Sequence, residues 1–454
     1  MKKNVLAFML CIAAHAAYCQ QDTLLQKFKF RINHYQAINY GANAGAQYNK
    51  SDFGGRIARF SDGSGNFGAN YYTTKSTDRM LLTISASLYA NANSNVSSSE
   101  ANGYHNKRYT LAPAFNLLNK WFTTKNFVEL GGIVSSNLIT DKTTDTNLPL
   151  YAKSTTGHYS LQINTGIGCG RLENITDMQN ALWLYNDLKE SSLLSHPLSA
   201  DELNELGQAI TLANNTRVLD VRKRTQFILE TVDGFLQQKG LISKTDIHYF
   251  THLNDILFFA NNGQRLSGTE KFIRFTPGIN GGKQNQSQYD TSVNNNQYTN
   301  KSMVLTVGFN KFLPLKLTSQ NNYGAFAKLA IMDNNMILRY YHAGILINDI
   351  SAKATLKQAG VNAFFQHAIY PNTRTIINLI ISTEGGYQDF EHETNFYGHI
   401  NLTGGMNYFI SYRTSLMGTL GGGYTKNEYN NYQSFERIPK NLQLSASFGV
   451  VVNM

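Results

Sequence analysis

Residues 440–454, KNLQLSASFGVVVNM, alternate between apolar and polar side chains up to the last residue of the sequence. The polar face carries Gln, Ser, Gly and Asn, with Val451 as its one apolar side chain. The opposite face carries the apolar side chains of Leu442, Leu444, Ala446, Phe448, Val450, Val452 and Met454. A period of two is typical of a β-strand with one apolar and one polar face. We therefore expect this strand to be hydrogen-bonded into a sheet, pairing with a strand near residues 38–48.

The same alternation recurs along the chain. It is clearest in residues 82–92, 159–167, 303–309 and 400–410. These predicted strands run for about 10 to 15 residues, against ~5–6 in soluble sheets. Their polar faces carry mainly Ser, Thr, Asn, Gln and Gly instead of the Lys and Glu of a solvated sheet. Both features favour a membrane barrel over a soluble sandwich.

The predicted connections alternate in length. Long polar stretches lie at residues 49–66, 95–107, 140–150, 284–299, 384–394 and 426–440. Tight connections lie between them, near residues 76–78, 119–125, 313–314, 371–374 and 412–413. Outer-membrane barrels combine short periplasmic turns with longer external loops. The pattern predicts about 14 strands, within a range of 12 to 16. Residues 330–353 fit less well, as a long structured external loop or an extra pair of strands.

Composition supports a lipid-facing sheet. Charged residues make up 15% of the chain and aromatic residues 12%, and the mean hydropathy is −0.31. Low charge with many aromatic residues argues against disorder. Beyond the N-terminus no apolar run is long enough for a transmembrane helix. The low mean hydropathy is no objection, because in a barrel each apolar residue is followed by a polar one.

Residues 1–19 have the features of a secretory signal peptide. Lys2 and Lys3 precede the apolar residues 5–14, and Ala17-Tyr18-Cys19 is a candidate cleavage site. An alternative is acylation of Cys19 after cleavage. The mature chain keeps one cysteine, Cys169, so an internal disulfide is excluded. We expect Cys169 to be a small packed residue and not a nucleophile.

Residues 171–264 change to a helical period and predict about four helices. Thr176 with Gln179, and Ser199 with Glu202, have the spacing of capping boxes. Gly240 predicts a helix end. A segment of this size is too long for a turn, so it either hangs in the periplasm or fills the lumen as a plug.

The sequence therefore predicts an antiparallel transmembrane β-barrel of about 14 strands with an inserted all-α domain. Residues 20–170 form the N-terminal half of the barrel, 171–264 the helical domain and 265–454 the C-terminal half. Residues 171–261 carry 8 basic and 12 acidic side chains, a net charge of −4, whereas the rest of the mature chain is at +12. The basic part could contact lipopolysaccharide phosphates or favour anionic solutes, or its Lys and Arg simply mark strand ends at the membrane interface.

Three groups of residues are candidates for chemical sites. Gly166, Gly168 and Gly170 lack the spacing of a nucleotide-binding loop, so strand-exit glycines explain them better. His248 and His252 share a helix face, but Tyr249 stands where a zinc protease needs Glu. With Asp246 and Asp255 nearby, a metal site is the alternative to a wetted helix face.

Single residues of the type used by barrel hydrolases are also present. They are Glu129, Ser382 and His399, and no spacing pairs them. Glu129 is expected to point into the lumen, where it lines a pore or pairs with a strand Arg. We predict no enzyme, and no catalytic, cofactor or metal residue is assigned.

The chain resembles outer-membrane β-barrel proteins of Gram-negative bacteria, with a Bacteroidota-like character. The resemblance rests on the signal ending at residues 18–23 (YCQQDT) and on the terminal strand at 448–454 (FGVVVNM), which ends in Met where an aromatic residue is usual. It implies location in the cell outer membrane and recognition by the barrel-assembly machinery. It covers the barrel and not the helical insertion, and no specific family is matched.

Two functions follow from this interpretation. The first is a porin-like channel for small polar solutes, because about 14 strands can enclose an aqueous path. The second is a non-conducting barrel anchor whose periplasmic helical domain binds an envelope protein or peptidoglycan. The expected surroundings are outer-membrane lipid and lipopolysaccharide; no nucleic acid partner and no cofactor are expected.

Overall fold

The computed structural model describes residues 23–53, 56–98, 103–145, 151–216, 218, 220–259, 264–288, 292–390, 393–411, 414–430 and 441–452. The predicted signal peptide, Cys19 and Met454 lie outside the described residues. Among the described helices, none is both long enough and apolar enough to cross a bilayer.

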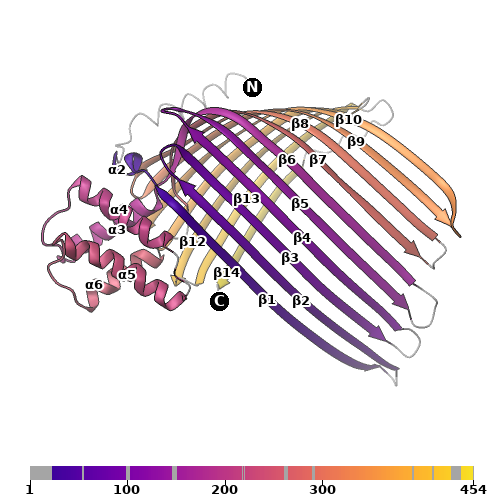
Figure 1. Cartoon of the computed structure of the whole chain (residues 1–454), viewed down its shortest axis with the longest axis horizontal. Helices are drawn as coiled ribbons and strands as arrows, with labels where there is room; N and C mark the ends of the chain where they lie inside the picture. The colour runs from indigo at the N-terminus through magenta and orange to yellow at the C-terminus, as the bar shows by residue number, and fades with distance from the viewer. Residues whose placement is uncertain are drawn as a thin grey trace.

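One antiparallel sheet of 14 strands dominates the molecule. The strands are β1 (Ile32–Phe53), β2 (Arg56–Ser76), β3 (Met80–Ser98), β4 (Gly103–Phe122), β5 (Asn126–Asp145), β6 (Tyr151–Asn174), β7 (Leu266–Gln288), β8 (Ser292–Lys316), β9 (Ser319–His342), β10 (Ile345–Asn372), β11 (Thr375–Phe390), β12 (Glu393–Ser411), β13 (Thr414–Asn430) and β14 (Asn441–Val452). Each strand pairs with the next one along the chain, and β6 pairs with β7 across the helical insertion. The predicted fold class and strand number are confirmed. The sheet is rolled, so that the last strands lie behind the first ones in Figure 1.

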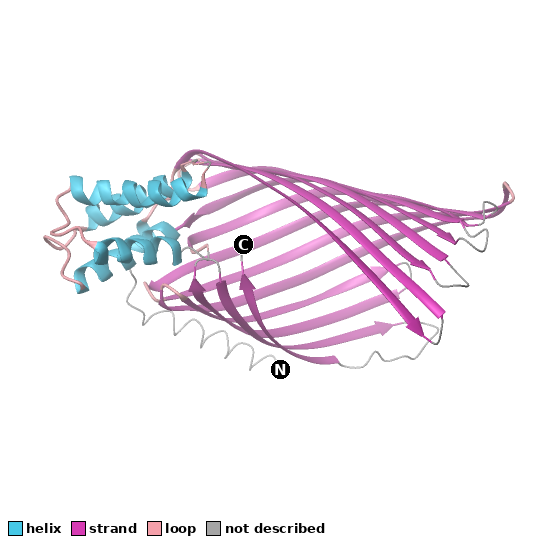
Figure 2. Cartoon of the chain, turned by 90° about the horizontal axis from the view of Figure 1, so that it is seen from below, coloured by secondary structure: helices cyan, strands magenta, loops and turns pink. Residues whose placement is uncertain are grey.

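The helical insertion has its own apolar core. It consists of α3 (Thr176–Glu190), α4 (Ala200–Asn215), α5 (Val221–Gln238) and α6 (Ile247–Phe259), and the short helix α2 (Thr23–Lys27) precedes β1. Leu25 and Phe28 of the N-terminal segment join the core formed by the four helices. The helices gather at one end of the sheet, as Figures 1 and 2 show.

Two of the three predicted helix signals are confirmed. Ser199 and Glu202 form a capping box at the start of α4. Gly240 has a φ of +65°, and the Leu241 N–H donates to the carbonyl of Leu236 at 2.9 Å, as in a Schellman motif. The capping box at Thr176 is wrong. Thr176 already lies inside α3, where its backbone N–H and its hydroxyl both donate to Asn174 Oδ1.

The strands are longer than the sequence pattern predicted. They reach 28 residues in β10, and most of the polar stretches interpreted as external loops are continuations of paired strands. The backbone ladder provides the hydrogen bonds, so Asn, Gln, Ser and Thr can occupy both faces where strands leave the apolar region. Residues 330–353 are likewise the ends of β9 and β10 joined by a tight turn, not a separate loop or extra strands.

The two faces of the sheet differ sharply. The face that we call the outer face carries apolar side chains that are 40% to 62% exposed. Examples from six strands are Val128, Leu130, Ile163, Ile167, Ile273, Phe275, Met303, Leu305, Leu329, Ile331, Ile400 and Leu402. The opposite, inner face is polar and more shielded. This pattern is typical of a sheet with lipid on one side and an enclosed polar space on the other.

Lysines bound the apolar band of the outer face. Lys271 and Lys283 flank it on β7, and Lys311 and Lys301 flank it on the neighbouring β8. The residues between the two lysines of β7, 272–282, match the ~9–11 residues that a tilted strand needs to span a bilayer. The band therefore has the height of a membrane core.

Strands β1 and β14 are the edges of the sheet. Within the described residues β1 is paired only with β2, and β14 only with β13. The expected pairing of the terminal strand with residues 38–48 is not formed there. Unpaired edges are costly in hydrocarbon, so we expect β1 and β14 to pair when the sheet lies in a bilayer.

Candidate functional site

The inner face of the sheet is lined mainly by neutral polar side chains. Its members include Asn116, Ser135, Gln162, Asn164, Thr276, Asn280, Ser302, Thr306, Gln358, Asn401 and Thr403. Amides join neighbouring strands by hydrogen bonds. Asn322 Nδ2 donates to Gln366 Oε1 at 3.0 Å, and Gln366 Nε2 donates to Asn378 Oδ1 at 3.1 Å. Such a surface offers donors and acceptors to a solute without binding one sign of charge.

Four charged side chains interrupt this lining near the helical end. Glu129, 2% exposed, accepts two hydrogen bonds from Arg274, at 2.6 and 2.9 Å. Lys120 donates to both oxygens of Glu270, at 2.7 and 2.8 Å, and its Nζ lies 3.4 Å from Glu129. The expected pairing of Glu129 with a strand Arg is confirmed. The four charges balance, which limits the cost of burying them.

The glycines of the G-x-G-x-G sequence make this arrangement possible. Gly166 lies between Glu129 and Arg274 in the register, and a Cβ there would meet Ile273 O at 3.0 Å. The absence of a side chain lets the ion pair of β5 and β7 reach across β6. At Gly168 a Cβ would lie 2.4 Å from the ring of Phe127. The glycines are thus strand residues that clear space for side chains on both neighbouring strands.

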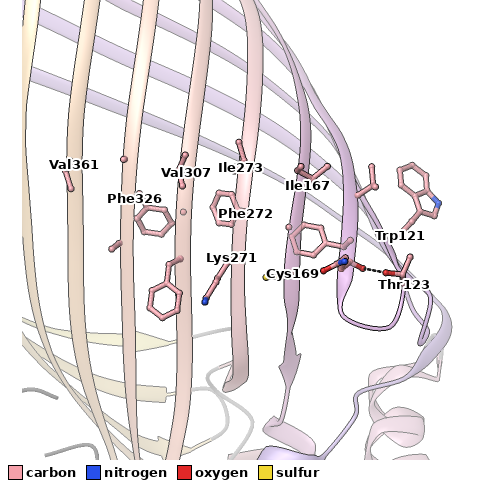
Figure 3. Close-up of a pocket in the computed structure, with 18 residues that line it drawn as sticks. Trp121, Thr123, Ile167, Cys169, Lys271, Phe272, Ile273, Val307, Phe326 and Val361 are labelled. Atoms are coloured by element: carbon pink, nitrogen blue, oxygen red, sulfur yellow. Dashed lines mark hydrogen bonds between the residues drawn. The ribbon is translucent and has the colours of Figure 1, made fainter. Parts of the chain in front are cut away.

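Phenylalanines and glycines alternate along one row of the inner face. In the register, Phe127, Gly168, Phe272, Gly308 and Phe326 follow one another over β5 to β9. The Phe127 ring covers the bare backbone of Gly168 and the Phe272 ring covers that of Gly308, a known stabilising device in sheets. Figure 3 shows Phe272 and Phe326 in this row, with Ile273 and Val307 from the outer face beside them. An alternation of Phe and Gly on separate strands is invisible until the register is known.

Replacing Gly308 by alanine should destabilise the sheet. A Cβ there would lie 2.3 Å from Cζ of Phe272, and the three nearest atoms all belong to that ring. We expect G308A to lose about 1–3 kcal/mol of unfolding free energy, as overpacked cores do. Urea unfolding of the refolded protein in lipid vesicles measures this loss.

The matched control is Gly157→Ala, because a Cβ at Gly157 meets only Leu138 Cδ1, at 3.9 Å. Adding F272L to G308A should recover part of the loss. Equal stability of G308A and G157A would contradict the role assigned to this row.

The helical insertion, which we call the cap, lies at the end of the sheet that carries the β2–β3, β4–β5, β8–β9 and β10–β11 turns. Residues 176–181 of α3 are all buried, although a helix on a surface exposes one side. Helices α4 and α6 pack against α3, and Leu25 and Phe28 of the N-terminal segment join the same core. The first turns of α3 are therefore buried inside the cap.

Arginines join the cap and its base to turns spaced around the rim. Arg265, which follows the cap and directly precedes β7, is 1% exposed and donates to the carbonyls of Lys316 and Leu317, both at 2.7 Å, at the β8–β9 turn. Arg374 of the β10–β11 turn forms an ion pair with Asp255 of α6.

The N-terminal segment provides a further attachment. Arg31 binds Asp78 of the β2–β3 turn at 2.8 Å and Glu173 at the end of β6 at 2.9 Å. This hydrogen-bonded ion pair lowers the pKa of the exposed Asp78 carboxyl below its usual value.

Asp177 makes the stability of the cap depend on pH. Burial raises the pKa of this α3 carboxyl, and hydrogen bonds from Thr211 and Asn214 oppose the shift. A raised pKa means that the folded cap binds the proton more tightly than the unfolded chain. Stability is then fully present below the unfolded value of 3.8, and it falls as the pH rises through the folded pKa.

Melting of the helical circular dichroism signal between pH 3 and 8 measures this slope. We expect D177N to flatten it, whereas D201N, on an exposed carboxylate at the start of α4, should leave it unchanged. An unchanged slope in D177N would show that another group titrates.

The remaining candidate residues are not brought together as one site. His252 Nδ1 hydrogen-bonds to Asp187 at 2.5 Å, whereas Asp255 binds Arg374. Asp246 accepts from the backbone N–H of Tyr249, and the ammonium of Lys244 and this N–H lower its pKa to about 2. No group of three or more His, Cys, Asp or Glu side chains is arranged for a metal ion in the part of the chain that the structure describes.

Of the hydrolase-type residues, two share a patch and one lies apart. Ser382 and His399 lie on adjacent strands of the inner face, opposite Asn401 and Glu384 respectively. Glu129 belongs to the ion network around Arg274 instead. The structure therefore does not assemble these three residues.

Cys169 is exposed on the outer face beside Ile167. The expectation of a packed cysteine is wrong. Alternation places it on the apolar face.

Comparisons with known proteins give fold-level likenesses alone. No protein-family model matches the sequence, and no curated protein matches it. Among solved structures, the chain is similar to the translocator domain of autotransporter NalP from Neisseria meningitidis, at 9% identity and a TM-score of 0.24, over 90% of this chain and 98% of that one. It is also similar to the Pseudomonas putida toluene transporter TodX, at 7% identity and a TM-score of 0.29, over 96% and 95% of the two chains. A third similar structure is the CymD monoaromatic hydrocarbon channel, at 10% identity and a TM-score of 0.24, over 95% and 90%.

Proposed function

We propose that this protein is a channel of the bacterial outer membrane that passes small polar solutes and whose periplasmic mouth is closed by the helical cap. The observation that carries the proposal is the contrast between the two faces of one continuous sheet. The outer face has an apolar band of membrane height, and the inner face has a hydrogen-bonding, mostly neutral lining. A lining of this kind favours solutes that exchange hydrogen bonds with water for hydrogen bonds with amides.

The orientation follows from the strand ends. At the end opposite the helical insertion, β8 extends from Lys301 to Ser292 and β9 from Ile331 to His342, further beyond the apolar band than at the other end, and outer-membrane barrels have their longer extensions on the external side. The β9–β10 hairpin and the long ends of the other strands then project outward. The cap would have to be displaced, by a partner or by the solute gradient, before the channel conducts.

Liposome swelling tests the proposed function. Vesicles that contain the protein without its cap should swell in small neutral sugars and much less in larger oligosaccharides. Similar rates for sugars and salts of equal size are expected from the neutral lining. Absence of swelling for every solute, in a variant that folds normally, would refute the channel.

A second function has specific support in the cap itself. Leu212 of α4 and Ile247 of α6 expose 64% and 79% of their surface, and Phe250 exposes 40%. Apolar side chains left in water on a helical domain suit protein contact. A barrel that anchors an envelope partner through this surface is therefore the alternative. Capture of a periplasmic partner by the full-length protein, lost in L212S/I247S, would favour it, provided that neither the full-length nor the cap-deleted barrel conducts.

A further inference from the structure

A polar hollow lies on the outer face just beyond the apolar band. Its volume is about 750 Å³, and it is lined by β8 to β11. Lys301, Lys353 and Lys357 contribute three exposed ammonium groups, against the two carboxylates of Asp333 and Asp389. Among the described residues, no ion pair joins any of these lysines to a carboxylate. The hollow therefore presents a net positive charge with its cations available.

An apolar groove continues directly from this hollow into the band. Its volume is about 420 Å³, and Lys357 lines both spaces. In the register, Met303, Ile331 and Lys357 form one row across β8 to β10. Lys301 and Asp333 form the next row outward, where Thr355 donates to Asp333 at 2.9 Å. The cations thus begin at the end row of the groove with Lys357 and continue outward over the next two rows with Lys301 and Lys353.

The depression extends further toward the helical end. Ala325, Ala327 and Val361 line a third hollow, of about 1010 Å³, which Figure 3 shows. Small side chains at these outer positions leave space where neighbouring strands carry Ile, Leu or Phe. From Asp333 to Ala325 the track runs for about 26 Å along β9, at ~3.3 Å per residue. Allowing for a strand tilt of ~45°, this is close to the thickness of one leaflet.

We propose that this track binds a phosphate-bearing lipid of the outer leaflet, of the lipid A class. Its acyl chains lie in the groove, and its phosphate contacts Lys301, Lys353 and Lys357. Ammonium groups at the top of an apolar groove match a ligand with an anionic head and apolar tails. The outward direction rests on the orientation given under the proposed function. The two carboxylates favour a head group that also carries hydroxyl donors, as a sugar does.

Binding of purified diphosphoryl lipid A to the refolded protein in detergent tests the site. The triple variant K301Q/K353Q/K357Q should bind at least tenfold more weakly than the unmodified protein. The matched control is K311Q, which removes a lysine of the opposite border of the band that lines none of the three hollows, and it should bind within twofold of the unmodified protein. Dephosphorylated lipid A should bind weakly, and its affinity should be the same for the triple variant and for the unmodified protein.

Two further arms separate the sources of phosphate and the part played by the groove. Inorganic phosphate at millimolar concentration should not displace lipid A; full displacement would indicate a free-phosphate site and overturn the proposal. A327F/A359F fills the third hollow at Ala327 and the groove at Ala359, and it should weaken lipid A binding at least fivefold, with heat-modifiable migration confirming the fold. Unchanged binding in K301Q/K353Q/K357Q, or an equal loss in the control, would also overturn it. Conductance of the cap-deleted barrel is read separately, so failure of the channel and failure of the lipid site are distinguishable.

Discussion

Deleting residues 176–264 should raise the ion conductance of the refolded protein in planar bilayers at least tenfold. The cap lies at the end of the rolled sheet and α6 is bound to the β10–β11 turn, so we expect the cap to obstruct the mouth. Ile175 N–H donates to Arg265 O at 2.8 Å, so the two ends are adjacent and a two-residue linker can join them. The deletion also uncovers the apolar side chains of Leu25 and Phe28. The substitutions L25S/F28S replace both side chains and keep the shortened protein soluble.

A milder variant supports the same conclusion with the cap present. Arg374→Gln releases α6 from the β10–β11 turn, and R31Q releases the segment before β1. Together they should produce intermittent openings. K189Q, on an exposed lysine at the end of α3, is the matched control and should stay closed. Equal conductance of the full-length and deleted proteins would contradict a closing role for the cap.

Replacing Glu129 by alanine should cost about 2–3 kcal/mol of unfolding free energy, because it leaves the half-buried guanidinium of Arg274 without its partner. Glu129 faces both Arg274 and Lys120, and only Lys120 has a second carboxylate, Glu270. Urea unfolding in lipid vesicles, followed by tryptophan fluorescence, measures the loss. The double variant E129L/R274M removes both charges and should recover most of it.

The matched control lies on the same strand. Asp141 pairs with Arg108 at 3.6 Å, and both side chains are at least 36% exposed. An exposed pair of this kind contributes about 1 kcal/mol or less. D141A should therefore be nearly neutral. If E129A and D141A lose equal stability, the buried network does not stabilise the sheet as argued.

The alternation of apolar and polar residues predicts most of the fold. The period of two in residues 442–450 and in its counterparts fixes the outer and inner positions of each strand, and the change of period near residue 171 marks the insertion. The prediction that Glu129 points inward is confirmed, because a carboxylate on an alternating strand lies on the polar face. Local patterns of this kind need no knowledge of the neighbouring strand.

The predictions that were wrong concern features that depend on strand register and on how far each strand extends beyond the apolar band. The polar ends of the strands resemble loops in composition, and only the pairing partner distinguishes the two. The sequence predicts strand-exit glycines at Gly166 and Gly168, whereas both lie inside β6 and make room for side chains of β5 and β7. The three lysines of the polar hollow come from β8 and β10, which are separated in the sheet by β9, so no spacing in the sequence brings them together.

Closure of the sheet between β1 and β14 is the central claim, and disulfide trapping tests it most directly. In a C169S background, single cysteines at inner-face positions of β1 (39, 41, 43, 45 and 47) are combined with single cysteines at 443, 445 and 447 of β14. A disulfide requires the two Cα atoms to lie within about 7 Å. The control pair is Gly421→Cys with Ser445→Cys, which face each other across β13 and β14. We predict that one diagonal of the β1–β14 matrix forms intramolecular disulfides in the outer membrane as completely as the control. A control that oxidises while every β1–β14 pair stays reduced would contradict the closed barrel.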